Sequence, residues 1–190
     1  MRRFRLLVTS AIVSIFAALG VVAPAEAAVD YFLEVNGVPG ESHDSKFAKS
    51  IDVFSYTWGA SANSEKKGNK VNLSDLNVSK NVDVASPALF QRLVQGTTIP
   101  SVELIGRKAG ESQLVFLRYC FLDARVTSIQ HSGSAGGGDT PTENVSFGYA
   151  AVSLQYTPQD AKGGGLPSVF AGWNATTGDL IATYPDPCGL

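Results

Sequence analysis

Short runs of alternating apolar and polar residues follow one another along most of the chain after residue 28. This alternation is typical of β-strands that bury one face. Gly-rich and Pro-containing turns separate the runs, and the sequence contains no tandem repeat. Many short strands with turn signals between them are typical of antiparallel sandwiches and barrels. The pattern therefore predicts a mostly β fold, a small antiparallel barrel or two-sheet sandwich, with strands near residues 31–37, 50–59, 70–80, 101–110, 112–133 and 143–158.

Some of these runs carry information about the course of the strand. The run at residues 50–59 alternates regularly, and one face of its strand is expected to carry Asp52, Phe54, Tyr56 and Trp58. In the next run the apolar residues change face, which predicts a bulge or bend near Ser74–Asp75. Residues 112–133 are too many for one flat strand, so we expect a bend near Asp123.

One short helix is predicted at about residues 87–95. Ser86 can cap it, Pro87 suits the first helical position, and Gly96 can end it in the left-handed conformation. The expected apolar stripe consists of Leu89, Phe90, Leu93 and Val94. A helix this short is marginal alone. We therefore expect it to pack on the sheet, at an open end of a barrel, or to turn its polar face to a neighbouring subunit.

The first 27 residues have the order of a secretory signal peptide. A basic start precedes a long uncharged apolar run, and a small-x-small site at residues 25–27 follows. We expect cleavage between Ala27 and Ala28, export through the general secretory pathway of a bacterium to the periplasm or the exterior, and no stable membrane insertion afterwards. A retained transmembrane anchor is the alternative, since the run is long enough to span a bilayer. The folded domain is expected at residues 28–178, with a C-terminal tail at residues 179–190.

The two cysteines are Cys120, in an apolar strand-like run, and Cys188, near the C-terminus. Export places them where a disulfide can persist, and a bridge would tie the tail to the sheet. The alternative is a buried free thiol in a strand and an unrelated thiol in the tail. Both arrangements are compatible with the sequence.

Residue patterns that carry catalysis or metal binding are sparse. The histidines, His43 and His131, have no paired spacing, so no metal site is predicted. The sequence has neither a Gly-x-Ser-x-Gly turn nor a phosphate-binding Gly-x-x-x-x-Gly-Lys-Ser/Thr loop. Its net charge is −2, and its densest basic run, residues 65–70, is too short for a nucleic-acid surface. We therefore expect a protein that is not an enzyme and has no cofactor or nucleic-acid partner.

An ordered set of motifs extends along the chain from residue 31 to residue 178. Its most specific members are Asp83-x-Ala85-Ser86-Pro87, Arg107-Lys108-Ala109-Gly110, Pro141-Thr142-Glu143 and Gly172-Trp173. The set resembles the haemolysin-coregulated protein (Hcp) family, the inner-tube proteins of type VI secretion. The resemblance implies a small two-sheet barrel with one flanking helix. It also implies hexameric rings with an open lumen, stacking of rings into a tube, small effector proteins as cargo, and no catalysis.

The resemblance also implies contact residues. In the family a loop that projects from the barrel helps one ring to grip the next, and residues 58–71 match it. The candidate contacts between subunits or rings are Trp58, Ser61, Asn63, Glu65, Lys66, Lys67, Gln91, Arg92, Glu143 and Trp173. Trp58 and Trp173 are alternatively core residues at strand ends. Glu143 is alternatively a hydrogen-bonding group in a turn, or a solvated residue at the start of a strand.

The predicted leader departs from the family pattern. The family tube is built in the cytoplasm, and a chain exported one molecule at a time would miss that assembly site. A second function therefore stays open, that of an exported binding or surface protein that reuses the barrel without an injection role. Genes for a sheath and a baseplate nearby would favour the tube function.

Overall fold

The computed structural model describes residues 28–63, 70–109, 113–135, 140–184 and Cys188. The predicted leader and its cleavage position after Ala27 lie outside the described residues, as do Glu65, Lys66 and Lys67. The described elements, in chain order, are β1 (Val29–Val35), β2 (Ile51–Val53), β3 (Ser55–Thr57), β4 (Ala60–Asn63), β5 (Lys70–Leu73), β6 (Leu76–Asn81), α1 (Ser86–Gln95), β7 (Ile99–Lys108), β8 (Val115–Ser132), β9 (Thr142–Gly148), β10 (Ala151–Tyr156), β11 (Val169–Asn174) and β12 (Asp179–Ile181).

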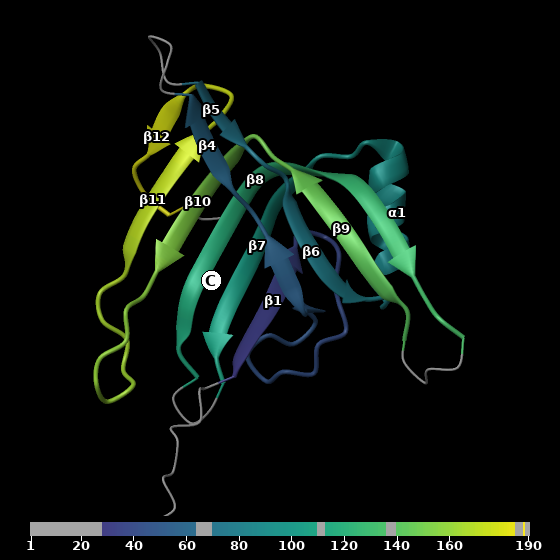
Figure 1. The fold of residues 1–190 in the computed structure, drawn as a ribbon, viewed down its shortest axis with the longest axis horizontal. Helices are drawn as coiled ribbons and strands as arrows, with labels where there is room; N and C mark the ends of the chain where they lie inside the picture. The colour runs from purple at the N-terminus through teal and green to yellow at the C-terminus, as the bar shows by residue number, and fades with distance from the viewer. Residues whose placement is uncertain (1–27, 64–69, 110–112, 136–139, 185–187, 189–190) are drawn as a thin grey trace, which may run out of the picture.

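The strands form two antiparallel sheet regions that share the long strand β8 (Figure 1). The first region has the order β12-β11-β10-β8-β7-β1-β2, and the second places β9 between β8 and β6, with β3 beyond β6. A separate hairpin, β4–β5, forms its own two-stranded sheet. The mostly β, antiparallel fold class predicted from the sequence is thus confirmed. Residues 179–181, which were predicted to belong to the tail, instead add β12 to the edge of the first region.

At Phe54 the chain passes from the first sheet region to the second. β2 pairs with β1, whereas β3 pairs with β6, and the Phe54 backbone N–H donates to Ser79 O at 2.8 Å between them. Ile51 and Val53 are buried and Phe54 is 57% exposed, as regular alternation requires. Tyr56 and Trp58, which share the predicted face of Phe54, nevertheless pack against the core. The prediction of one regular face from residue 52 to residue 58 is therefore wrong, because the buried face changes where the strand changes partner.

The two other predicted irregularities are present. Residues 74–75 separate β5 from β6, and the core-facing residues of β6 are Leu76 and Val78. Asp123 takes a positive φ of 49°, and there β8 changes partner: its pairing with β7 ends at Ala124 and its pairing with β9 begins at Arg125. A residue in this sparsely allowed conformation turns the strand from one region into the other.

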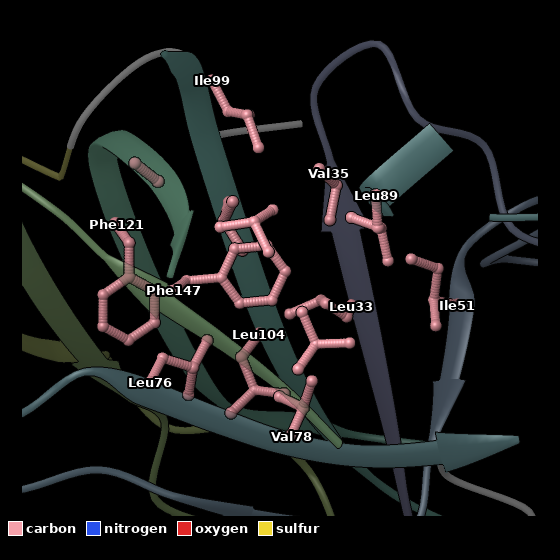
Figure 2. Close-up of a cluster of buried hydrophobic side chains, with 14 of the residues drawn as sticks. Leu33, Val35, Ile51, Leu76, Val78, Leu89, Ile99, Leu104, Phe121 and Phe147 are labelled. Carbon is pink, nitrogen blue, oxygen red and sulfur yellow. The ribbon is translucent and has the colours of Figure 1, made fainter. Parts of the chain in front are cut away.

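The main hydrophobic core lies between the two regions and under the helix. Figure 2 shows Leu33 and Leu104 from the first region facing Leu76, Val78 and Phe147 from the second. All five side chains are at most 2% exposed. Burying a side chain of this size contributes about 1.5–3 kcal/mol, so this contact between the regions is a main source of stability.

The helix α1 begins and ends close to the predicted residues but faces the core differently. Gly96 takes the left-handed conformation, with φ 61°, as expected. Leu89 is fully buried and Leu93 packs against the core, but Phe90 and Val94 are 57% and 64% exposed. The predicted stripe is thus half right, because the sheet covers only one side of the helix.

The start of α1 also differs from the prediction. The N-cap residue is Ala85, and no side chain caps the helix. The Ser86 hydroxyl instead accepts a hydrogen bond from the backbone N–H of Asp83 at 3.0 Å, and Asp83 Oδ1 accepts one from the Ala85 N–H at 2.9 Å. These bonds order the turn before the helix. The Ser86 side chain therefore points into the interior and does not cap the helix.

Candidate assembly surfaces and the buried groups that support them

A buried polar cluster joins the start of α1 to β6 and β9. Lys80 and Glu143 are fully buried, and Lys80 Nζ donates to Glu143 Oε2 at 2.6 Å. Lys80 Nζ also donates to Asp83 Oδ1 at 2.7 Å, and Ser86 Oγ donates to Glu143 Oε2 at 2.8 Å. His131 Nε2 lies 2.8 Å from Glu143 Oε1. Both buried charges therefore have several partners, which offsets the cost of removing them from water.

The position of Glu143 agrees with the interpretation as a hydrogen-bonding group at a turn, since it accepts hydrogen bonds from Lys80 and Ser86 where α1 begins. Its side chain is 0% exposed in the single chain, so it is neither solvated nor presented to another subunit. Burial alone would raise the pKa of Glu143, but hydrogen bonds from Lys80, His131 and Ser86 lower it. The Glu143 carboxylate therefore links the start of α1 to strands β6 and β9 inside the protein. Lys80 follows Leu76 and Val78 at two-residue spacing, so the strand alternation already placed its side chain inward.

A second polar cluster fixes the loop between β1 and β2. The Arg107 guanidinium donates to both carboxylate oxygens of Asp44, at 2.9 and 2.7 Å, and to Asp30 Oδ2 at 2.8 Å. It also lies over the rings of Phe32 and Phe47, 4.9 and 5.5 Å from their centroids. Arg107 comes from the Arg-Lys-Ala-Gly motif, and the structure gives this motif residue a structural role on the face opposite the main core.

This cluster predicts a specific dependence of stability on pH. The side-chain hydrogen bond from Arg107 lowers the pKa of Asp44 from 3.8 to about 2. A carboxylate with a depressed folded-state pKa stabilises the fold above its unfolded pKa, and this contribution is lost as pH falls through the folded value. We expect Asp44→Asn to make the loss of stability between pH 4 and pH 2 shallower than in the wild type, measured by urea unfolding. Asp179→Asn, at the exposed start of β12, is the charge control; parallel pH profiles for Asp44→Asn and wild type would contradict this role.

The segment predicted to contact the next ring forms the hairpin β4–β5. Ala60 pairs with Leu73 and Ser61 with Asn72, and Ser61 is exposed. Asn63 ends β4, and the tip at residues 64–69 lies outside the described residues. In Figure 1 the hairpin extends beyond the second sheet region and passes in front of the strands toward the β11–β12 edge. The described part of this segment is thus a two-stranded hairpin beside the last strands, and its contact with another ring stays a prediction.

An apolar groove lies between this hairpin and the last three strands. It has a volume of about 340 Å³, and its lining residues are Trp58, Ala60, Val71, Leu73, Val152, Leu154, Ala171, Gly172, Trp173 and Leu180. Leu180 is 80% exposed and Val71 is 37% exposed, so the groove opens to solvent. An exposed apolar groove is a candidate interaction surface.

The two tryptophans occupy different positions in the groove. Trp58 packs against the main core, its ring lies 5.3 Å from that of Tyr119, and its Nε1 donates to Tyr149 Oη. Trp173 pairs with Val152 across β10 and β11 and is half-buried. The structure therefore places Trp58 in the core and at the groove floor, and Trp173 in the groove wall.

A second exposed apolar surface lies on α1. Phe90 and Val94 are one helical turn apart and form an apolar ridge that points away from the sheet. Of the predicted contacts on this helix, Gln91 is exposed beside the ridge, whereas Arg92 is half-buried over the turn at Gly37. Figure 1 shows α1 on the opposite side of the molecule from β11 and β12. The ridge and the groove thus lie on opposite flanks of one chain.

Three further sequence questions concern a metal site, a membrane-spanning helix and the two cysteines. Within the described residues, no group of three or more His, Cys, Asp or Glu side chains could hold a metal ion. The same residues include no helix long and apolar enough to span a membrane. Cys120 and Cys188 form a disulfide, which attaches the end of the chain to the first sheet region.

Comparison with known proteins agrees with this fold. A family model described as type VI secretion system effector, Hcp, matches residues 32–156. Protein hcp1 of Pseudomonas aeruginosa is 37% identical over 156 residues, which cover 77% of this chain and 95% of that protein. A solved type six secretion system protein matches with a TM-score of 0.76 at 34% identity, covering 81% of this chain and all of the other. Hcp1 from Salmonella typhimurium matches with a TM-score of 0.70 at 32% identity, covering 81% and 99% of the two chains. The chain therefore belongs to the Hcp family of type VI secretion proteins.

Proposed function

We propose that this protein is a non-enzymatic tube component that assembles into hexameric rings, and that the rings stack and carry small effector proteins in their lumen. Family membership supports the tube role, and the number six rests on the family resemblance. The observation that carries assembly in this chain is the pair of exposed apolar surfaces, the ridge on α1 and the groove beside β11–β12.

The two surfaces complement one another in shape and chemistry. The ridge is convex and apolar, with Phe90 as a large aromatic anchor, and the groove is concave and lined almost wholly by apolar side chains. Buried aromatic anchors in pockets are the usual centres of binding energy in protein interfaces. Because ridge and groove lie on opposite flanks, contact between copies is head-to-tail, and such contacts either close into a ring or continue as a filament.

Stacking of rings is proposed for the outer edges and tip of the β4–β5 hairpin, whose other side lines the groove. Ser61, and the tip residues Glu65, Lys66 and Lys67 by their place in the sequence, would meet the next ring. The hairpin supports this assignment because it pairs only with itself among the described strands, so its outer edges are free. A free strand edge offers unpaired backbone groups to a neighbouring chain.

The test of the ring interface is Phe90→Glu. A charge at the centre of an apolar contact is expected to weaken subunit association by at least about 30-fold, which corresponds to about 2 kcal/mol. The mass of the protein in solution, measured by light scattering over a concentration series, reports this change. Gln91→Glu adds the same charge one residue away, beside the ridge, and should change association much less. Equal association of Phe90→Glu and wild type would exclude the ridge as the interface.

An exported binding or surface protein is the second candidate function. It is favoured by the leader-like sequence at residues 1–27 and by the Cys120–Cys188 disulfide, since disulfides persist in oxidising compartments. We propose export through the general secretory pathway on the same grounds. A monomeric exported protein that keeps its fold would favour this second function over the tube.

A further inference from the structure

The disulfide lies on the sheet face opposite the main core. Tyr119 and Phe121 on β8 point toward the core, so Cys120 between them points to the other face. It is fully buried, and Cys188 is 2% exposed. Cys120 lies between Glu103 on β7 and Ser153 on β10 in the strand register. Cys188 is thus held against the outward face near the middle of the first sheet region.

A second contact holds the end of the chain to the same face. The Tyr184 hydroxyl donates to Glu103 Oε1 at 3.1 Å, and Arg118 Nη1 donates to the same oxygen at 2.7 Å. Glu103 is 3% exposed, and its burial raises the pKa of its carboxyl. The Tyr184 ring also meets the Phe170 ring edge-on, with centroids 6.4 Å apart. Two described positions after β12 are therefore fixed to strands β7, β8 and β11.

The strand just before these fixed points, β12, is weakly held, whereas β11 pairs with β10 through six residues. β12 pairs through only three residues and forms the outer edge of the sheet. Leu180 on β12 and Val169 on β11 are 80% and 61% exposed. Segments with few buried contacts and exposed backbone hydrogen bonds open most readily. The disulfide fixes the chain beyond β12 to β8 and so limits how far β11 and β12 can separate from β10.

These same two strands form one wall of the apolar groove. Ala171, Gly172 and Trp173 come from β11 and Leu180 from β12. The wall also packs closely against the disulfide region: a methyl group placed on Gly172 would lie 2.5 Å from Ser153 Oγ, next to Cys120 in the register. The groove is therefore on the core-side face of β10, β11 and β12, and the disulfide is on the opposite face of the same sheet, at the neighbouring strand β8.

We propose that the Cys120–Cys188 disulfide controls subunit association by holding β11 and β12 in place as the wall of the groove. This inference rests on the proposed assembly of the protein through that groove. A dithiol reductant transfers two electrons and two protons to the disulfide, the S–S bond breaks, and two cysteine thiols form while the dithiol becomes a disulfide. The reduced chain keeps its core but loses the fixed wall, so subunits associate in an oxidising compartment and separate in a reducing one.

The experiment compares the oxidised protein, the same protein in dithiothreitol, and the variant Cys188→Ser. Hydrogen exchange is measured on β11–β12 and, as an internal reference, on the core strand β7, and subunit association is measured in parallel. Reduction is expected to speed exchange in β11–β12 by at least tenfold, leave β7 protected, and weaken association by at least tenfold. Cys188→Ser should match the reduced protein and should not respond to dithiothreitol.

Four results would overturn the proposal. Unchanged exchange of β11–β12 on reduction would show that the disulfide does not hold the wall. Faster exchange in β7 as well would show general unfolding and no local release. Reduction could loosen β11 and β12 while the rings stay equally stable in both redox states. That result would contradict the control of assembly by the disulfide but leave the proposed tube function intact. An oxidised protein that stays monomeric would contradict the proposed assembly and with it the control by the disulfide. The exchange data would still show whether the disulfide holds β11 and β12.

Discussion

Glu143→Ala is expected to lower the free energy of unfolding by about 3–5 kcal/mol, the usual cost of removing one partner of a buried ion pair. Glu143 accepts hydrogen bonds from Lys80 and Ser86, and its removal leaves the fully buried Lys80 ammonium with only one carboxylate, Asp83. The cost is largely the desolvation of that remaining charge. Urea unfolding followed by tryptophan fluorescence measures the change.

Two further variants make this prediction specific. Replacing the three charges together, Lys80→Met with Asp83→Asn and Glu143→Leu, should recover much of the stability, because buried ion pairs and triads can often be exchanged for uncharged residues of similar size. Glu41→Ala removes a carboxylate from an exposed position and should change stability by no more than about 0.5 kcal/mol. A loss below about 1 kcal/mol for Glu143→Ala would mean that the cluster is not the tie between helix and sheet described above.

Replacing both cysteines, Cys120→Ala with Cys188→Ala, should lower stability by about 4 kcal/mol. The disulfide links residues that are 68 positions apart, and a loop of this length strongly restricts the unfolded chain in the chain-entropy model. For a domain of this size the loss corresponds to a fall in Tm of about 10 °C. Thermal unfolding of the oxidised wild type and the double variant measures it.

Dithiothreitol provides the control for the cysteine prediction. It should lower the Tm of the wild type and leave the double variant unchanged. If the wild type and the double variant unfold at the same temperature under oxidising conditions, the disulfide contributes nothing to stability. That result would also contradict the structural link between the end of the chain and β8.

Strand alternation predicted most of the fold because each buried strand has one inward face. Leu76 and Val78 alternate inward, and Lys80 continues the pattern even though it is charged. Alternation failed after Phe54, where β2 leaves β1 and β3 joins β6. That change of partner is set by the packing of two sheet regions, which no local pattern encodes.

The candidate surfaces were harder to predict than the fold. Phe90 and Val94 fit an apolar helix stripe as well as Leu89 and Leu93 do, and only the position of the sheet decides which pair is buried. The contact residues carried over from the family resemblance include Glu143, which the fold buries completely. The groove was missed because its lining comes from strands far apart in sequence, although Trp58 and Trp173 were both marked as candidates.

The most direct test of the proposed function is the mass of the mature protein, residues 28–190, purified from an oxidising compartment, with electron microscopy of the same material. The account predicts a mass of six protomers and ring-shaped particles with an open centre. A folded protein that remains a monomer at high concentration would contradict it.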